Sequence, residues 1–249
     1  MDTPRDGVEP PPKGSALFTT THWSVVLAAS QGGDAQASPA LEQLCLTYWF
    51  PLYAYVRRRG YGPEDAQDLT QEFFAHLLDR DFLRGVTPQK GKFRSFLLVS
   101  MQHFLADEWD KARTQKRGGE QRPLALDEQA ETRYQLEPVE PANAETLYER
   151  QWGLTLLDRV LDRLQQEFAS AGKQALFDAL RPRLVGDKAG GTYASLATRL
   201  DMTEGAVKVA VFRLRRRFQE LFREEIARTV ADPAEVESEV QHLLGVLRT

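Results

Sequence analysis

Hydrophobic residues recur every three or four positions through most of the chain, with polar residues between them, which is the pattern of amphipathic helices. The pattern predicts helices over residues 39–59, 63–78, 93–117, 145–169 and 173–184, a helix pair within 192–222, and a last helix after residue 232. In the 145–169 segment the expected inward stripe is Leu154, Leu157, Leu161, Leu164 and Phe168. No segment alternates clearly like a strand. The predicted fold class is therefore all-α, with two helical domains joined by a flexible linker.

The segment 192–222 is predicted to form a short helix, a turn and a longer basic helix. In the first helix, Tyr193, Leu196, Ala197 and Leu200 fall on one face. Thr203 is a suitable N-cap for the second helix, whose apolar stripe is Val207, Val211, Leu214, Phe218 and Leu221. Its remaining surface carries Lys208, Arg213, Arg215, Arg216 and Arg217. This is the helix-turn-helix arrangement, in which the second helix enters the DNA major groove.

Charge is unevenly distributed along the chain. The net charge is −4, yet residues 204–223 and residues 111–122 each sum to +4. A solvated, arginine-rich helix face is the alternative interpretation of the first of these segments. Because the positive charge is concentrated in an otherwise acidic chain, we expect nucleic-acid contact there.

The helix predicted over 93–117 combines aromatic and basic residues. Phe93, Phe96 and Phe104 are expected in the core, whereas Arg94, Gln102, His103 and Trp109 are expected on the opposite side. Aromatic side chains beside cations suit single-stranded or distorted nucleic acid, because bases stack on the rings and phosphates pair with the cations.

The helix predicted over 63–78 has an acidic ridge formed by Asp65, Asp68, Glu72 and, just beyond it, Asp79. One interpretation is solubility together with favourable acids near a helix N-terminus. The other is a docking surface for a basic partner, because no Lys or Arg lies between residues 63 and 79. The spacing alone does not separate the two.

Composition limits the function classes. With 249 residues, 42% hydrophobic and 27% charged, the chain suits a soluble protein of two small domains. Its single cysteine, Cys45, excludes an internal disulfide, and we expect a buried, inert thiol. We see neither a membrane-spanning stretch nor a signal peptide, so we expect a cytoplasmic protein without a membrane partner.

Residues typical of catalytic or metal sites do not occur in the required patterns. The four histidines, His22, His76, His103 and His242, show no metal-ligand spacing with each other or with Cys45. No phosphate-binding glycine motif and no nucleophile–base pair can be identified. We therefore expect neither an enzyme nor a bound metal or cofactor.

The predicted domain organisation follows from these patterns. Residues 1–14 are rich in proline and glycine and are expected to be disordered; residues 15–117 form the first helical domain, 118–144 a flexible linker, 145–230 the second domain, and 231–249 a C-terminal amphipathic helix. The last helix starts with Asp232 as its cap, Pro233 and Glu235. It is expected to pack back on the preceding domain, with docking to a partner helix as the alternative.

Taken together, the two halves resemble a bacterial RNA polymerase sigma factor of the sigma-70 family, of the extracytoplasmic-function (ECF) type. The resemblance covers about residues 39–117 and 150–223. Its most specific parts are YWFPLYAYVRRRGYGPEDAQDLTQEFFAHLL, similar to regions 2.1 and 2.2, and YASLATRLDMTEGAVKVAVFRLRRRFQEL, similar to region 4.2.

The resemblance implies a sigma factor that binds core RNA polymerase, at its clamp and flap regions, and directs promoter recognition and transcription initiation. Core-polymerase binding would then fall to Asp65, Asp68, Gln71 and Glu72. The residues expected at the minus-ten element of promoter DNA are Lys90, Lys92, Arg94, Gln102, His103, Trp109, Lys111, Arg113, Lys116 and Arg117. Those expected at the minus-thirty-five element are Thr203, Glu204, Gly205, Lys208, Val209, Phe212, Arg213, Arg215 and Arg216.

Two departures from the family pattern bear on specificity. Gln102-His103 stands where the family commonly has an Arg-Asn pair, and Val209-Ala210 stands where the recognition helix commonly has Ser-Arg. Both departures remove polar base readers, so the family's promoter sequence does not carry over.

Two alternative functions stay open at this stage. One is a helix-turn-helix transcriptional regulator that acts without core polymerase, and the other is a sigma-like adaptor that lacks promoter opening. The sequence also leaves open whether an anti-sigma or other regulatory protein binds, and whether the N- or C-terminal extension regulates access in cis.

Overall fold

The computed structural model describes residues 22, 37–77, 92–114, 129–136, 143–184, 191–230 and 232–248, and of residues 37–40, 43 and 111–114 it describes the backbone only. Within these ranges every regular element is helical, which confirms the all-α prediction. None of the described helices is both long and apolar enough to cross a membrane. The elements are α2 (Ala37–Arg58), α3 (Pro63–Leu77), α5 (Phe93–Thr114), α6 (Ala130–Gln135), α7 (Ala144–Ser170), α8 (Gln174–Leu180), η2 (Arg181–Arg183), α9 (Tyr193–Leu200), α10 (Glu204–Ala227), η4 (Pro233–Glu235) and α11 (Val236–Val246).

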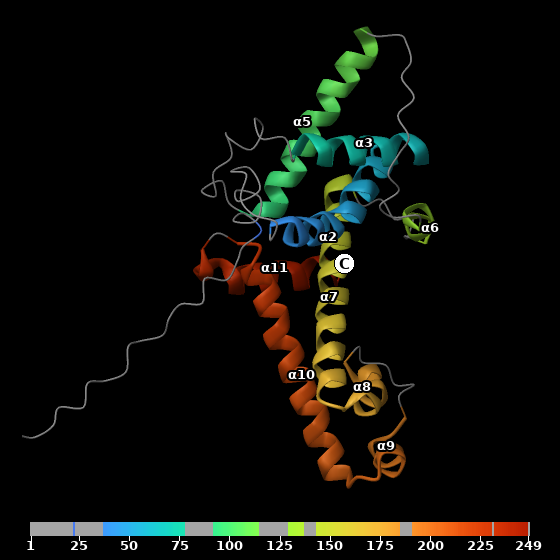
Figure 1. Cartoon of the computed structure of the whole chain (residues 1–249), viewed down its shortest axis with the longest axis vertical. Coiled ribbons are helices and arrows are strands. Elements are labelled where there is room, and N and C mark those ends of the chain that lie inside the picture. Colours follow the sequence, from blue (N-terminus) through green and yellow to red (C-terminus); the bar gives the residue numbers. More distant parts are fainter. Residues whose placement is uncertain are drawn as a thin grey trace, which may run out of the picture.

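Two long helices, α7 and α10, run antiparallel along the longest axis of the molecule (Figure 1). The first half of α7 packs against α2, and α3 and α5 lie beyond α2 at that end. The second half of α7 packs against α8 and α10, with α9 at the opposite end of the molecule. The last helix, α11, lies across α7 near the end of α10.

One continuous set of buried residues connects α2, α7 and α10. At its centre the rings of Tyr48 and Trp152 stack with centroids 6.4 Å apart, and Phe93 meets Tyr48 edge-on at 5.5 Å. The helix α7, which the sequence assigned to the second domain, therefore shares its core with α2 of the first. The division into two domains joined by a linker stays a prediction.

The buried face of α7 differs from the predicted stripe. Leu164 is buried as expected, but Leu154, Leu157 and Leu161 are only half-buried. The interior is instead formed by Leu147, Tyr148, Trp152, Leu156 and Val160. The reason is that α7 packs against helices on more than one side, so its apolar face is broader and turned relative to a stripe drawn for a single contact.

Helix boundaries follow the local chemistry of the sequence. The side chains of Thr192 and Thr203 accept hydrogen bonds from backbone N–H groups in the first turns of α9 and α10, as N-caps do. Asp201 ends α9 in the left-handed conformation, with φ 51°, which Asp and Asn tolerate better than most residues. Asp232 caps the turn that leads into α11, as predicted.

A short helix, α6, lies within the segment that was predicted to be a flexible linker. Glu131 of α6 accepts hydrogen bonds from Arg57 Nε and Nη2 at 2.8 and 2.9 Å and from the Tyr53 hydroxyl at 2.6 Å. The Arg57 guanidinium lowers the pKa of Glu131 to about 2. These bonds fix α6 on α2, so residues 130–135 differ from the expected irregular structure.

Candidate nucleic-acid-binding surfaces

The helix pair α9–α10 is positioned by a small apolar contact and a tight turn. Leu196 and Ala197 of α9 are buried against α10, where Val207, Val211 and Leu214 form the facing stripe. The turn between the helices consists of Asp201, Met202 and the N-cap Thr203. This arrangement leaves the opposite side of α10 at the surface, as the sequence predicted.

The exposed side of α10 carries most of the residues predicted for the minus-thirty-five element. Phe212 is 66% exposed and Val209 is 49% exposed, unusually high values for large apolar side chains. Exposed around them are Thr203, Glu204, Gly205, Lys208, Arg213, Arg215 and Arg216. The structure therefore places all of these predicted residues at one surface.

The cations of α10 have different degrees of constraint. Lys208 Nζ lies 2.8 Å from Glu204, whose carboxylate raises the pKa of Lys208. Arg216 pairs with Glu220 at 3.0 Å in an exposed i,i+4 contact, and Arg215 donates to the backbone carbonyl of Arg183 at 2.8 Å. Each of these three side chains is exposed and is held by an intramolecular partner.

Arg217 behaves differently from these cations. It is half-buried, and Glu167 of α7 accepts two hydrogen bonds from its guanidinium at 2.8 and 2.7 Å. The same guanidinium also pairs with Glu220 and Glu224. Arg217 therefore fastens α10 to α7.

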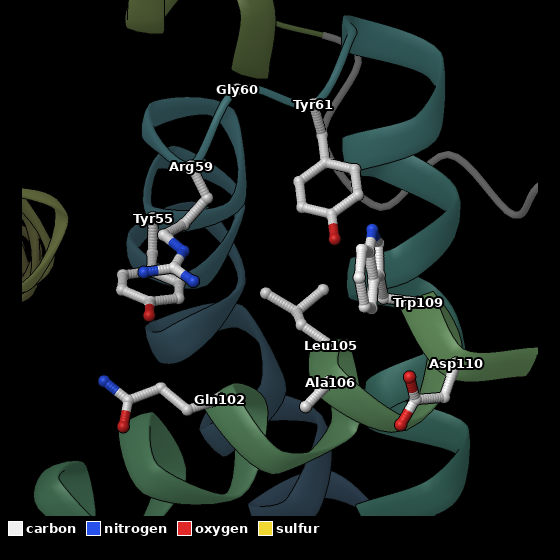
Figure 2. A pocket seen from close by; sticks show the side chains of 9 residues that line it. All are labelled: Tyr55, Arg59, Gly60, Tyr61, Gln102, Leu105, Ala106, Trp109 and Asp110. Atoms are coloured by element: carbon white, nitrogen blue, oxygen red, sulfur yellow. The ribbon is translucent and has the colours of Figure 1, made fainter. Parts of the chain in front are cut away.

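A second surface is a cleft of about 640 Å³ between the end of α2, the turn that follows it, and α5 (Figure 2). Tyr61 and the 56%-exposed Trp109 present aromatic rings to it. Arg59 and Gln102 supply hydrogen-bond donors, and Asp110 supplies an acceptor. Aromatic rings, a cation and an amide around one open cleft can hold a planar heterocycle with a phosphate beside it.

The sequence identified only part of this cleft. Gln102 and Trp109 were predicted as nucleic-acid contacts, whereas Tyr55, Arg59 and Tyr61 were not. A signal was present in the segment Arg57-Arg58-Arg59-Gly60-Tyr61, where cations and an aromatic residue surround a glycine with φ 100°. Gly60 turns the chain at this point, which brings Tyr61 to the same cleft as Trp109.

The predicted role of Arg94 does not fit this structure. Arg94 is only 3% exposed; it pairs with Glu239 of α11 and with Glu149 of α7, and its guanidinium lies 5.0 Å from the Trp152 ring centre. A DNA phosphate cannot reach a side chain in this position. The helical pattern placed Arg94 opposite the core, but α11 covers that side of α5.

Lys92 is also engaged inside the molecule. Its Nζ lies 2.5 Å from Glu239, whose side chain has no exposed surface. Burial lowers the pKa of Lys92, and the nearby charge of Arg94 acts in the same direction. Arg94 could therefore contact DNA only if α11 first moved away, whereas Lys92, whose side chain is 31% exposed, has only to leave Glu239.

Of the remaining residues predicted at the minus-ten element, the structure describes some with their side chains, some by the backbone only and some not at all. His103 is exposed on α5, and Gln102 is half-buried and donates to Glu145 at 3.3 Å. Lys111 and Arg113 lie in α5, where only the backbone is described. Lys90, Lys116 and Arg117 lie outside the described residues.

The acidic ridge of α3 is at the surface. Asp65, Asp68 and Glu72 are exposed, and Gln71 is half-buried. Buried Ala66, Phe73, Phe74 and Leu77 hold the other side of α3 against the core. Asp79 lies outside the described residues.

In the described ranges, no three His, Cys, Asp or Glu side chains come together as a possible metal site. Burial raises the pKa of Cys45 to about 11, which keeps this thiol protonated at neutral pH.

Comparison with known proteins gives no assignment, because no protein-family model, curated protein or solved structure matches this chain.

Proposed function

We propose that this chain is a sigma factor, which binds core RNA polymerase and directs it to promoter DNA. The observation that carries the proposal is the exposed cationic face of α10 directly after the capped turn that follows α9. In a helix-turn-helix unit this is the face that enters the major groove.

The cleft between α2 and α5 supports a second DNA contact of a different kind. A sigma factor has to keep promoter strands apart, and unstacking a base costs on the order of a few kcal/mol. Stacking a captured base on an aromatic side chain returns about 1–3 kcal/mol. Trp109 and Tyr61 present their rings to the cleft, and Arg59 lines it as a cation that could meet a phosphate.

The surface of α3 supports the polymerase contact. Three of its acids, Asp65, Asp68 and Glu72, are exposed, and α3 lies at the same end of the molecule as α2 and α5 (Figure 1). A basic surface on the polymerase could therefore dock there by charge complementarity.

Run-off transcription on a library of genomic fragments, with purified core polymerase, tests the proposal. A sigma factor gives discrete transcripts that require the chain. A chain that binds specific duplexes equally well without polymerase is a free-standing regulator. A chain that binds polymerase but yields no transcript is an adaptor without promoter opening.

The cleft can be tested in the same assay with Trp109→Ala. We expect this variant to lose transcription from duplex templates and to regain it on a template with a mismatched, pre-opened minus-ten segment. Val99→Ala, which truncates an exposed apolar side chain elsewhere on α5, is the matched control. Equal loss on both templates would contradict a role in capturing an opened base.

The contacts of α11 favour an additional role of the C-terminal segment in cis. Glu239 holds two cations that were predicted to contact promoter DNA, Lys92 and Arg94. Removal of residues 231–249 should then change promoter output at equal protein level. Unchanged output would show that the tail has only a structural role.

A further inference from the structure

The exposed face of α10 has an ordered pattern. Gly205, Val209, Phe212 and Arg216 are spaced i, i+4, i+7 and i+11, so at about 100° per residue they form a line along the middle of the face. Lys208 and Arg215 lie on one side of this line and Arg213 lies on the other. The centre of the face is therefore mainly apolar, and cations border it on both sides.

This pattern matches the cross-section of a major groove. The groove is about 12 Å wide, close to the diameter of a helix with its side chains, so a docked helix points its middle line at the base edges and its flanks at the two phosphate backbones. Among the base edges, the apolar group in the major groove is the C5-methyl of thymine. Val209 and Phe212 offer no hydrogen bond to a base edge, but both can pack against such a methyl group.

The first turn of α10 contains a second feature that the fold does not require. A Cβ atom added to Gly205 would meet no other atom within 4 Å, and the backbone of Gly205 is in an ordinary helical conformation. Glycine in a helix is unfavourable relative to alanine. Its presence fits a close approach of another molecule to the backbone at this point.

We infer that α10 reads duplex DNA through thymine methyl groups, which pack against Val209 and Phe212, while Lys208, Arg213 and Arg215 hold the flanking phosphates. The inference rests on the proposed function and adds the chemistry by which the helix selects its sequence. A protein partner is the competing occupant, because Gly205, Val209 and Arg213 also border an apolar cleft of about 580 Å³ between α7, α8 and α10. The cations on both sides of the apolar line favour duplex DNA, which is a polyanion, over a protein partner.

The probe is a duplex selected from a randomised pool by the full chain bound to core polymerase. Each thymine of the selected duplex is then replaced singly by deoxyuridine, which removes the methyl group and keeps every hydrogen-bonding group. We expect one or two positions to lose about fourfold in affinity, the ratio that corresponds to one buried methyl-sized group. Phe212→Ala should bind the thymine and deoxyuridine duplexes with equal affinity at the base pair whose methyl group packs against Phe212. Val209→Ala should do the same at the base pair that Val209 reads.

Two further variants separate readout from folding. Gly205→Ala should weaken binding to the selected duplex without lowering the melting temperature, because the added methyl group meets only the ligand. Leu46→Ala truncates another exposed apolar side chain, 45% exposed on α2, and should keep both the affinity and the methyl effect.

The outcomes are distinguishable. Binding that is equal for thymine and deoxyuridine at every position overturns the methyl readout but leaves the sigma-factor proposal intact. A methyl effect that persists unchanged in both Phe212→Ala and Val209→Ala also overturns it, because other residues would then read the methyl groups. Failure to retain any duplex, with or without polymerase, would remove the proposed function itself.

Discussion

Replacement of Glu239 by glutamine removes a negative charge from the interior while leaving the size of the side chain almost unchanged. Glu239 has no exposed surface, and it pairs with Arg94, which is itself almost fully buried, and with the half-buried Lys92. Loss of one partner of a buried ion pair costs about 3–5 kcal/mol, because the other charge is left without compensation. Glu149 still lies 3.3 Å from Arg94, and Lys92 can turn to solvent. We therefore expect the lower end, about 3 kcal/mol.

The assay is chemical denaturation at neutral pH, and the matched control is Glu237→Gln on the same helix. Glu237 pairs with Arg223 at 3.4 Å, but its side chain is 61% exposed. An exposed pair of this kind contributes less than about 1 kcal/mol. If Glu239→Gln destabilises the chain no more than Glu237→Gln does, the cluster is not a structural link between α5 and α11.

The same substitution has a consequence for DNA binding. With Glu239 neutral, Lys92 is free to reach a phosphate, while Arg94 remains held by Glu149. One additional phosphate contact makes the slope of log affinity against log salt concentration steeper by about 0.9 for duplex DNA. A slope identical to that of the native chain would show that Lys92 stays away from DNA even when it is released.

Two further predictions concern the surface of α3 and the pH dependence of stability. Reversal of both Asp68 and Glu72 to Lys should abolish co-purification with core polymerase while the circular dichroism stays helical; Asp107→Lys, at an exposed position of α5, is the control, and retained association would move the docking site elsewhere. Burial, together with the charges of Arg159 and Arg228, lowers the pKa of His22 from 6.5 to about 3. Below pH 6.5 the unfolded chain therefore binds a proton that the folded chain excludes, and the free energy of unfolding should fall by roughly 2 kcal/mol between pH 7 and pH 5. His22→Gln should flatten this fall in denaturation curves at the two pH values; an unchanged fall would assign it to another group. Glu131, whose pKa is about 2, loses its stabilisation only below about pH 4.5, outside this window.

The sequence was most informative where structure depends on near neighbours. The caps at Thr203 and Asp232 follow from residues within a few positions of each other, and the structure has them as predicted. Most of the predicted stripes of α9 and α10 is buried as well, but Tyr193, Leu200 and Phe218 are only half-buried. Each depends on helical periodicity or on one side chain bonding to the adjacent backbone. The exposed side of α10 could then be predicted as the helix face opposite its buried stripe.

Prediction failed where a side chain meets a segment far away in the chain. Periodicity placed Arg94 opposite the core of α5, and it could not indicate that Glu239 would cover that side. The same limit applies to the cleft: Tyr61 and Trp109 come from different elements, and only the fold brings them to one space. Likewise, nothing local in α6 indicates that Glu131 binds Arg57 of α2.

If the chain binds DNA as proposed, the intramolecular partners of its cations affect which of them a phosphate can reach. On α10, Lys208 and Arg216 pair with Glu204 and Glu220 of the same helix, in exposed contacts that solvent screens strongly. A phosphate can replace such a partner at little cost. At the start of α5 the partner is a fully buried carboxylate on a different helix, and its loss is several times more costly. If the chain binds DNA as proposed, phosphates should therefore compete first at α10, whereas Lys92 and Arg94 would become available only after their bonds to Glu239 are broken.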